Sequence, residues 1–277
     1  MNIYVAFGLA LVGLIALVIF FFSWSVFGNG KIIEEEREIS GVRGVDLAWR
    51  GSVRVVESGN GAVKVKTDGN IMPLVRTRLF GGILLIRPSH WLIFPTFLQI
   101  TVPADVLESL SISGSGSIHC VGTKKGESVK LTISGSGEMA GTFDSNSLNI
   151  SVLGSGKVKA DGRTKHLGLS IIGSGGMLLN GFEAENVRAS IPGSGSVTLG
   201  GKGDNISVFI AGSGSVKASH FEAQSAEVSI TGSGGAEVDA EKSLSASIVG
   251  SGSVKYRGNP KLEQRISGSG SLSKIED

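Results

Sequence analysis

From residue 110 onward, apolar and polar residues alternate along the chain, and the tripeptide Gly-Ser-Gly interrupts the alternation at regular intervals. A β-branched apolar residue stands two positions before each tripeptide, and an apolar residue stands four positions after its first glycine. Alternation with a period of two on both sides of a glycine turn is typical of strand, turn and strand. The first glycines of the nine tripeptides are Gly114, Gly135, Gly154, Gly173, Gly193, Gly212, Gly232, Gly250 and Gly268.

The tripeptides are 18 to 21 residues apart, a spacing that indicates a solenoid. Antiparallel hairpins are the alternative, but a meander of hairpins favours varied turns such as Asn-Gly. One turn sequence at one phase favours coils stacked by parallel pairing, with glycine allowing positive φ and close approach at each corner. The sequence therefore predicts an all-β parallel solenoid of about nine coils, roughly 43 Å long, with the right-handed crossover as default.

A second period of 39 residues separates Phe143, Phe182 and Phe221. The coils between them lack the phenylalanine and carry glycine-containing segments instead. We expect each phenylalanine to fill one corner of every second coil.

The pattern before residue 110 is less regular. Short alternating runs predict strands at 42–47, 53–55, 63–65, 83–87 and 99–102. The apolar segment 90–97 is too short to cross a membrane, and we expect it to cap the N-terminal end of the solenoid. A loop that touches a membrane or a partner is the alternative.

The N-terminal segment has no charged residue from Ile3 to Phe27. As a helix it would be roughly 37 Å long, enough to cross a bilayer, and it lacks the basic start and small-residue cleavage site of a signal peptide. We expect an uncleaved transmembrane anchor at 1–29, with Phe27 at its interfacial end. Residues 30–38 then form a charged, solvated linker, with one or two helical turns, and 39–277 form the solenoid domain (39–110 irregular coils and cap, 111–277 repeats).

Composition narrows the class of protein further. The 42 glycines do not recur at every third residue, which excludes collagen, and the hydrophobic share of 41% argues against disorder. A net charge of +2 without a basic block argues against nucleic acid as a partner. The single cysteine, Cys120, excludes an internal disulfide framework.

Candidate chemistry is sparse. Glu183, Asp204 and Glu222 follow their glycines by 10, 11 and 10 residues on consecutive coils and could form a carboxylate column for Ca²⁺. Charged residues on glycine-rich outer turns are more often only solvated, so we expect no metal and no cofactor. Since no Ser-His-Asp or Cys-His set can be assembled from the sequence, we expect a protein that is not an enzyme.

With these motifs in view, the chain over about residues 39–277 resembles the bacterial family named "putative autotransporter adhesin, head GIN domain". The resemblance rests on the opening strand 42–47, on Thr101-Val102-Pro103, and on nine in-phase tripeptides that begin in the segment 110–118. It implies a β-helix with two sheets joined at the glycine turns, and an exported envelope protein with a role in adhesion. It supplies no catalytic residues. Only seven residues follow Gly270, so we expect no C-terminal translocator barrel in this chain.

The leading hypothesis is a non-catalytic adhesin or structural surface module, anchored in the membrane of the cell envelope. A self-assembling scaffold is the alternative, because the last coil at 271–273 has few capping residues. Expected partners are the membrane, a surface polymer or protein, and a second copy of the chain. Lys31, Arg37 and Arg43 favour a cytoplasmic domain by the positive-inside rule, whereas the resemblance implies an extracytoplasmic one, so the side of the membrane stays open.

Overall fold

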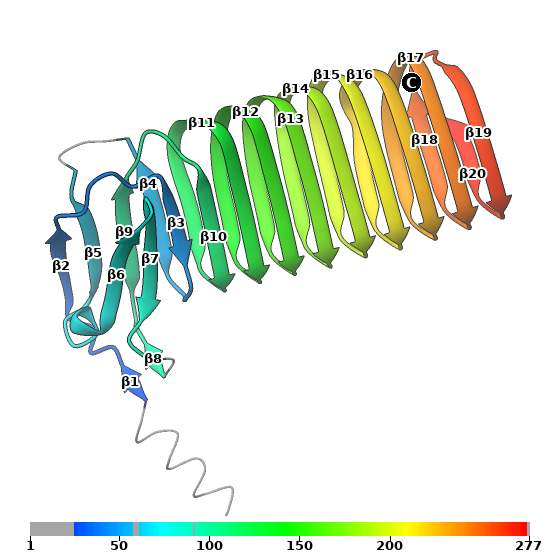
Figure 1. Cartoon of the computed structure of the whole chain (residues 1–277). Coiled ribbons are helices and arrows are strands. Elements are labelled where there is room, and N and C mark those ends of the chain that lie inside the picture. The colour runs from blue at the N-terminus through cyan, green and yellow to red at the C-terminus, as the bar shows by residue number, and fades with distance from the viewer. Residues whose placement is uncertain (1–24, 58–60, 91, 276–277) are drawn as a thin grey trace, which may run out of the picture.

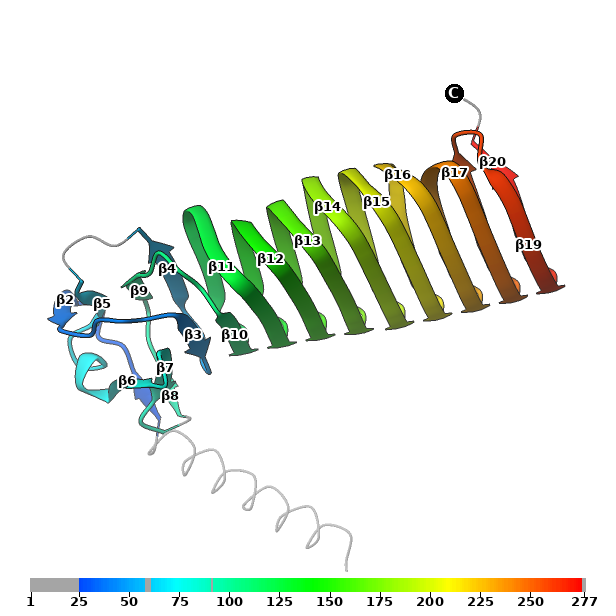
Figure 2. The same ribbon diagram turned by 45° about the horizontal axis from the view of Figure 1, so that its top comes forward.

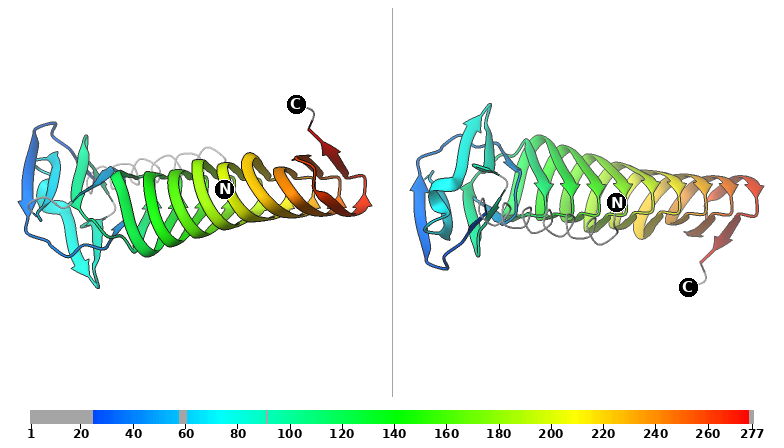
Figure 3. Two further views of the ribbon diagram at one scale, coloured as in Figure 1. Left: turned by 90° about the horizontal axis from the view of Figure 1, so that it is seen from above. Right: turned by 90° about the horizontal axis from the view of Figure 1, so that it is seen from below.

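The structure is a computed structural model that describes residues 25–57, 61–90 and 92–275. It is an all-β solenoid with a small cap at its N-terminal end, and its coils stack in one row (Figures 1 and 3). Among the described residues, the one helical turn is the 3₁₀ helix η1 (Met72–Leu74). Seven long strands each follow one coil from one Gly-Ser-Gly corner to the next. They are β11 (Ser117–Gly135), β12 (Glu138–Gly154), β13 (Lys157–Gly173), β14 (Gly176–Gly193), β15 (Ser196–Gly212), β16 (Ser215–Gly232) and β17 (Gly235–Gly250).

The coils pair in parallel and at constant phase, as the repeat predicts. Ile133 of β11 lies opposite Val152 of β12, and Val152 lies opposite Ile171 of β13. The apolar residues of each alternation face inward and are buried, while the polar residues between them face outward. The alternation in the sequence therefore builds one continuous core along the solenoid axis.

The Gly-Ser-Gly corner explains why both of its glycines recur. At Gly173, φ is +123°, and a Cβ atom there would lie 2.6 Å from the carbonyl oxygen of Gly154 in the preceding coil. At the second glycine, Gly175, a Cβ would lie 2.6 Å from Cγ1 of Val152. The β-branched residue two positions before each motif thus packs against the second glycine of the next coil. The recurring β-branched residue and the recurring second glycine are therefore the two partners of one contact.

The prediction for the phenylalanines is confirmed. Phe143, Phe182 and Phe221 are buried, and Phe182 lies opposite Gly201 of the next coil. A Cβ at Gly201 would lie against the carbonyl oxygen of Phe182. Large and absent side chains therefore alternate between coils at this corner, which accounts for the 39-residue period.

The N-terminal coils are built out of chain order. Strands β3 (Gly44–Leu47) and β4 (Ser52–Val56) pair in parallel with β10 (Ser109–Gly114) and β11. The chain then folds back, so that β7 (Ile83–Pro88) and β9 (Leu98–Pro103) pair in parallel on the other side of β3 and β4. The predicted strands of this region are confirmed. The outermost coil, however, is formed by β7 and β9, which follow β3 and β4 in the sequence.

Antiparallel strands cover the outer edges of that terminal coil (Figures 1 and 2). β6 (Val75–Phe80) pairs with β7, β5 (Val63–Asp68) pairs with β9, and β2 (Ile32–Arg37) pairs with β5. The cap is therefore formed by these strands, whereas segment 90–97, expected to form it, connects β7 to β9. Within this segment β8 (Ile93–Phe94) pairs with β1 (Val26–Phe27), and Leu92 and Ile93 are buried.

Two expectations about the N-terminal segment are corrected. Phe27 does not end a helix; it lies in β1 and stacks on Phe94 with ring centroids 5.2 Å apart. The expected linker 30–38 is not helical and belongs to the folded domain through β2. Most of the predicted anchor, residues 1–24, lies outside the described residues, and among those described no helix is long and apolar enough to cross a membrane.

Asp68 attaches this segment to the cap. Its buried carboxylate accepts hydrogen bonds from the backbone N–H of Gly30 at 2.8 Å, from the N–H of Thr96 at 2.8 Å and from the Thr96 hydroxyl at 2.6 Å. Burial opposes ionisation of Asp68, but these donors outweigh it and lower the pKa of the carboxyl. One charge thus joins β1, β2 and the β8 segment to the end of β5.

The C-terminal end of the solenoid consists of β18 (Ser253–Arg257), β19 (Lys261–Gly268) and β20 (Ser271–Lys274). β18 and β19 both pair with β17, and β20 pairs with β18. Every residue of β19 is exposed, in contrast to the buried alternation of the earlier coils.

Candidate functional site

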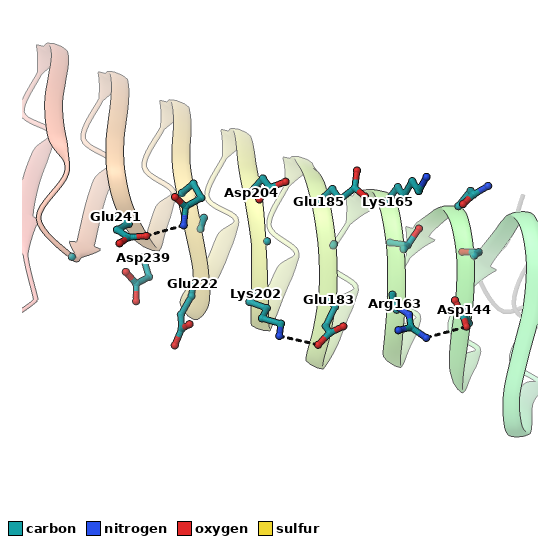
Figure 4. A pocket seen from close by; sticks show the side chains of 18 of the residues that line it. Asp144, Arg163, Lys165, Glu183, Glu185, Lys202, Asp204, Glu222, Asp239 and Glu241 are labelled. Atoms are coloured by element: carbon teal, nitrogen blue, oxygen red, sulfur yellow. Dashed lines mark hydrogen bonds and ion pairs between the residues drawn. The ribbon is translucent and has the colours of Figure 1, made fainter.

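A long hollow runs along one side of the solenoid, across the coils of β12 to β17. It has a volume of about 960 Å³, and we call it the charged groove. Figure 4 shows two rows of polar side chains along it, with one member from each coil in each row. The residues between the two rows face inward and are often small, as at Ala184, Gly203 and Ala223. They form the floor of the charged groove.

The first row follows the parallel register from coil to coil. Its members lie opposite one another in the order Asp144, Arg163, Glu183, Lys202, Glu222 and Asp239. Neighbours in such a row are about 4.8 Å apart. Arg163 pairs with Asp144 at 3.3 Å and Lys202 with Glu183 at 3.1 Å, so that the charges alternate over the first four coils.

The second row runs parallel to the first, two residues further along each coil. It consists of Asn146, Lys165, Glu185, Asp204, Gln224 and Glu241. The amide of Gln224 donates to Glu241 at 2.7 Å. The two rows together carry seven carboxylates against three basic side chains, and the acidic excess lies toward β17 (Figure 4). The groove therefore favours polar or cationic groups over anions.

The carboxylate column suggested by the sequence is not formed. Lys202 lies between Glu183 and Glu222, and Asp204 belongs to the second row, since its neighbours Gly203 and Asn205 pair with Ala184 and Asn186. Two coils separate Glu183 from Glu222, about 9.6 Å, whereas ligands of one Ca²⁺ ion lie within 2.6 Å of it. Within residues 25–57, 61–90 and 92–275, no group of three or more histidine, cysteine and acidic residues is placed to hold a metal.

The expected column is not formed because the coils differ in length. The coils of Phe182 and Phe221 each contain one residue more than the coil before them, and the extra residue is accommodated as a register shift at the corner before the phenylalanine, such as that between Leu179 and Phe182. Positions counted forward from a glycine therefore lose phase beyond this corner. Counting backward from the next tripeptide places Arg163, Glu183, Lys202 and Glu222 at the same position, ten residues before it, and would have found the row.

A second groove of about 750 Å³ lies beside the first, and amide, hydroxyl and charged side chains line it together with apolar residues such as Val187 and Ile206. One of its rows runs in register through His166, Asn186, Asn205, Ser225, Ser243 and Lys261. Asn205 donates to Asn186 at 3.0 Å, and the Ser243 hydroxyl lies 2.9 Å from that of Ser225. Such ladders link neighbouring coils through their side chains.

The two most strongly buried titratable groups outside the cap lie in the first coil, away from both grooves. Burial raises the pKa of the Cys120 thiol to about 12, and it lowers the pKa of Lys124, whose ammonium donates to the carbonyl of Ala104 at 3.0 Å. A thiol with a raised pKa is a poor nucleophile. Cys120 is therefore a core residue.

The family model described as "Putative auto-transporter adhesin, head GIN domain" matches residues 43–199 and 166–260, two overlapping stretches that cover most of the chain. The chain belongs to this family. The match begins one residue before β3 and ends between β18 and β19, so the GIN domain here includes both the out-of-order N-terminal coils and the corner repeats. Among curated proteins, none matches the chain.

Solved structures share the fold of this GIN domain. A structure described as a "putative adhesin" from Parabacteroides merdae ATCC 43184 has a TM-score of 0.73 and 20% identity, covering 91% of this chain and 99% of that one. A "putative lipid binding protein" and a "putative adhesin", both from Parabacteroides distasonis ATCC 8503, have TM-scores of 0.70 with 28% and 22% identity. Each covers 91% of this chain and 100% of its own.

Proposed function

We propose that this GIN domain is a non-catalytic adhesive module of the bacterial cell envelope, tethered by the N-terminal segment. The observation that carries the proposal is the pair of parallel polar grooves, whose side chains repeat once per coil over six coils. A regular row of polar groups about 4.8 Å apart suits an extended ligand that makes many weak contacts, such as a surface polymer or an extended peptide.

The charges of the groove support binding over catalysis. Two of its basic residues form ion pairs with carboxylates of the same row, Arg163 with Asp144 and Lys202 with Glu183. No histidine or cysteine is among the described residues that line the charged groove. General acid–base catalysis needs a group tuned to exchange protons near neutral pH. We propose that the groove serves recognition alone.

Tethering is supported by the uncharged apolar run from Ile3 onward, which precedes the first described residue, Ser25. A run of this length and composition suits a membrane anchor. With such an anchor, the cap lies nearest the membrane, and the solenoid carries the grooves away from it.

One structural relative is described as a lipid binding protein, which makes lipid a second ligand class to test. Both grooves here are lined mainly by charged, amide and hydroxyl groups and suit a polar ligand better than an acyl chain. We therefore expect no retention of the domain on neutral phosphatidylcholine vesicles beyond that caused by the anchor.

The decisive test compares adhesion of cells that carry the wild-type chain with cells that carry Lys202→Glu together with Arg163→Glu. Reversing both basic residues leaves only acidic charge in the first row, so adhesion to a neutral or anionic surface polymer should fall at least severalfold, whereas adhesion to a cationic one should rise. Lys159→Glu together with Lys217→Glu is the matched control, because both lysines are exposed and line neither groove. Equal adhesion of all three strains, at equal protein levels, would overturn the adhesive role of the groove.

The side of the membrane is tested separately. Protease added to intact cells and to spheroplasts should cut an extracytoplasmic solenoid in at least one of the two, at exposed positions such as Lys255. Protection in both, with digestion only after lysis, would place the domain in the cytoplasm and end the envelope proposal.

A further inference from the structure

The two ends of the solenoid differ in how their strand edges are covered. Antiparallel strands cover the N-terminal coil, whereas among the described residues β19 pairs only with β17, along one of its edges. In β19, Leu262, Gln264 and Ile266 continue the inward-facing columns of β17. Leu262 is nevertheless 44% exposed and Ile266 40% exposed. A strand edge with exposed apolar side chains is a template for another strand.

The hydrogen-bond pattern of the solenoid shows which backbone groups this edge offers. The carbonyl of each first glycine accepts from the N–H of the serine in the next coil, as Gly232 does from Ser251 at 2.9 Å. Within a parallel strand, successive residues direct their N–H and C=O groups alternately to one neighbour and to the other. Residues an even number before Gly268 therefore direct both groups to the free edge. In β19 these residues are Leu262, Gln264 and Ile266.

We propose that a second copy of the chain pairs with this edge, β19 against β19, about a two-fold axis at Gln264. A two-fold axis pairs a strand with itself in the antiparallel sense. In an antiparallel pair, residues with free N–H and C=O groups must face each other, which requires an axis that passes through a residue of β19. An axis at Gln264 satisfies this condition and places Leu262 opposite Ile266 of the second copy.

Charge selects this axis among its neighbours. With the axis at Gln264, Glu263 faces Arg265 of the second copy, and symmetry makes this pair twice. An axis at Glu263 would place the Glu263 carboxylates of the two copies opposite each other. An axis at Arg265 would do the same with the two Arg265 guanidinium groups. Like charges opposite each other destabilise a strand pair, and opposite charges stabilise it.

The axis also gives a role to the one break in the repeat. Position four before the first glycine is apolar in eight coils and polar only at Gln264. An amide is both donor and acceptor, so two Gln264 side chains related by the axis can bond each other. The pairing covers Leu262 and Ile266, and it closes at two copies because a two-fold interface uses the same strand edge of both copies.

Cysteine cross-linking of the full chain in detergent tests the axis. Gln264→Cys faces itself at a Cα separation near 5.5 Å, within the range of a disulfide, and should give a covalent dimer under mild oxidation. Glu263→Cys alone and Arg265→Cys alone should not, because their own copies lie about 7–8 Å away on the diagonal. A mixture of these two chains should cross-link as a heterodimer. Cys120 does not compete, since it is buried and its pKa is about 12.

Proline substitution separates dimerisation from folding. Gln264→Pro removes an N–H that points to the free edge, so the melting temperature of the monomer should stay unchanged while the dimer is lost. Arg265→Pro is the matched control, because it removes an N–H used by β17 and should lower the melting temperature whatever the oligomeric state.

Charge reversal tests the selection of the axis by analytical ultracentrifugation in detergent. Glu263→Arg should weaken the dimer on the order of tenfold, and the double change Glu263→Arg with Arg265→Glu should restore it. A wild-type chain that is monomeric at all concentrations overturns the proposal, as does a dimer that Gln264→Pro leaves intact. Cross-linking by Glu263→Cys alone places the axis elsewhere and overturns the register. None of these outcomes depends on adhesion, so the proposed function is tested independently.

Discussion

The repeat coils and the N-terminal cap belong to one hydrogen-bonded sheet system, yet they are held together in different ways. In the coils, the backbone bonds recur at every corner, as in the bond from Ser174 to Gly154, and most contacts are copies of a contact one coil away. In the cap, contacts of individual side chains hold the strands together, above all the hydrogen bonds to the buried carboxylate of Asp68. A repeated interface distributes its stability over many equal contacts, whereas a cap depends on a few that occur once.

The comparison predicts different responses to substitution. A change at a corner should unfold the coils it joins, because each coil supports its neighbours. A change in the cap should open the cap and leave most coils in place.

The largest effect is expected for Gly173→Val. The substitution places a β-branched residue at a φ of +123°, with its Cβ 2.6 Å from a backbone oxygen, and should cost at least about 3 kcal/mol in the free energy of unfolding. Denaturant unfolding followed by circular dichroism measures it. Gly176→Ala is the control, because that glycine has no positive φ and its nearest new contact is 3.6 Å. Equal stability of both variants would contradict the corner geometry.

Phe182→Ala should follow, with a loss of about 3–5 kcal/mol for truncation of a fully buried aromatic side chain. The same measurement applies, and Phe209→Ala serves as control since Phe209 is 44% exposed. If the two variants lost the same free energy, the view that phenylalanine fills every second coil would fail.

Asp68→Asn should cost about 2 kcal/mol, because an amide replaces an ionised acceptor of several hydrogen bonds. Hydrogen exchange should increase at Gly30 and Thr96 but not in the coils of β13 to β16. Faster exchange throughout the solenoid would show that cap and coils unfold as one unit.

The pH dependence of the cap has a definite sign. The pKa of Asp68 is lowered in the folded state, so its stabilisation is complete above the ordinary value of about 3.9 and is lost as the pH falls through the folded value. Exchange at Gly30 should therefore be insensitive to this group between pH 7 and 5 and should rise in more acidic solution, less so in Asp68→Asn. A rise near pH 6 would assign the effect to another group.

The smallest effect on stability is expected for Lys202→Met in the charged groove. The ion pair with Glu183 is exposed, with both side chains more than half accessible, and such pairs contribute less than about 1 kcal/mol. Glu183→Gln is the matched change on the other partner. A loss of several kcal/mol in either variant would mean that the row holds the coils together and is not free for a ligand.

The sequence was sufficient for the coils because their period is encoded in every repeat. The in-phase tripeptides and β-branched residues define the corner, and the spacing of Phe143, Phe182 and Phe221 defines the coil pair. The cap was predictable only as separate strands, since nothing in the order of β3, β4, β7 and β9 reveals that the later strands lie outside the earlier ones. The linker was misjudged because the exposed, charged residues of β2 do not alternate as a buried strand does.

What the sequence alone determined is therefore the family, the parallel coil and its corners, because these follow from local alternation and from the room that glycine leaves. What only the tertiary structure decided is which outer residues become neighbours. The register shift at the phenylalanine corner moves Lys202, and not Asp204, between Glu183 and Glu222. The carboxylate column expected from the sequence is therefore a row of carboxylates and basic side chains in the structure. The reason is that one extra residue at the phenylalanine corner changes which residues of neighbouring coils lie opposite each other beyond that corner.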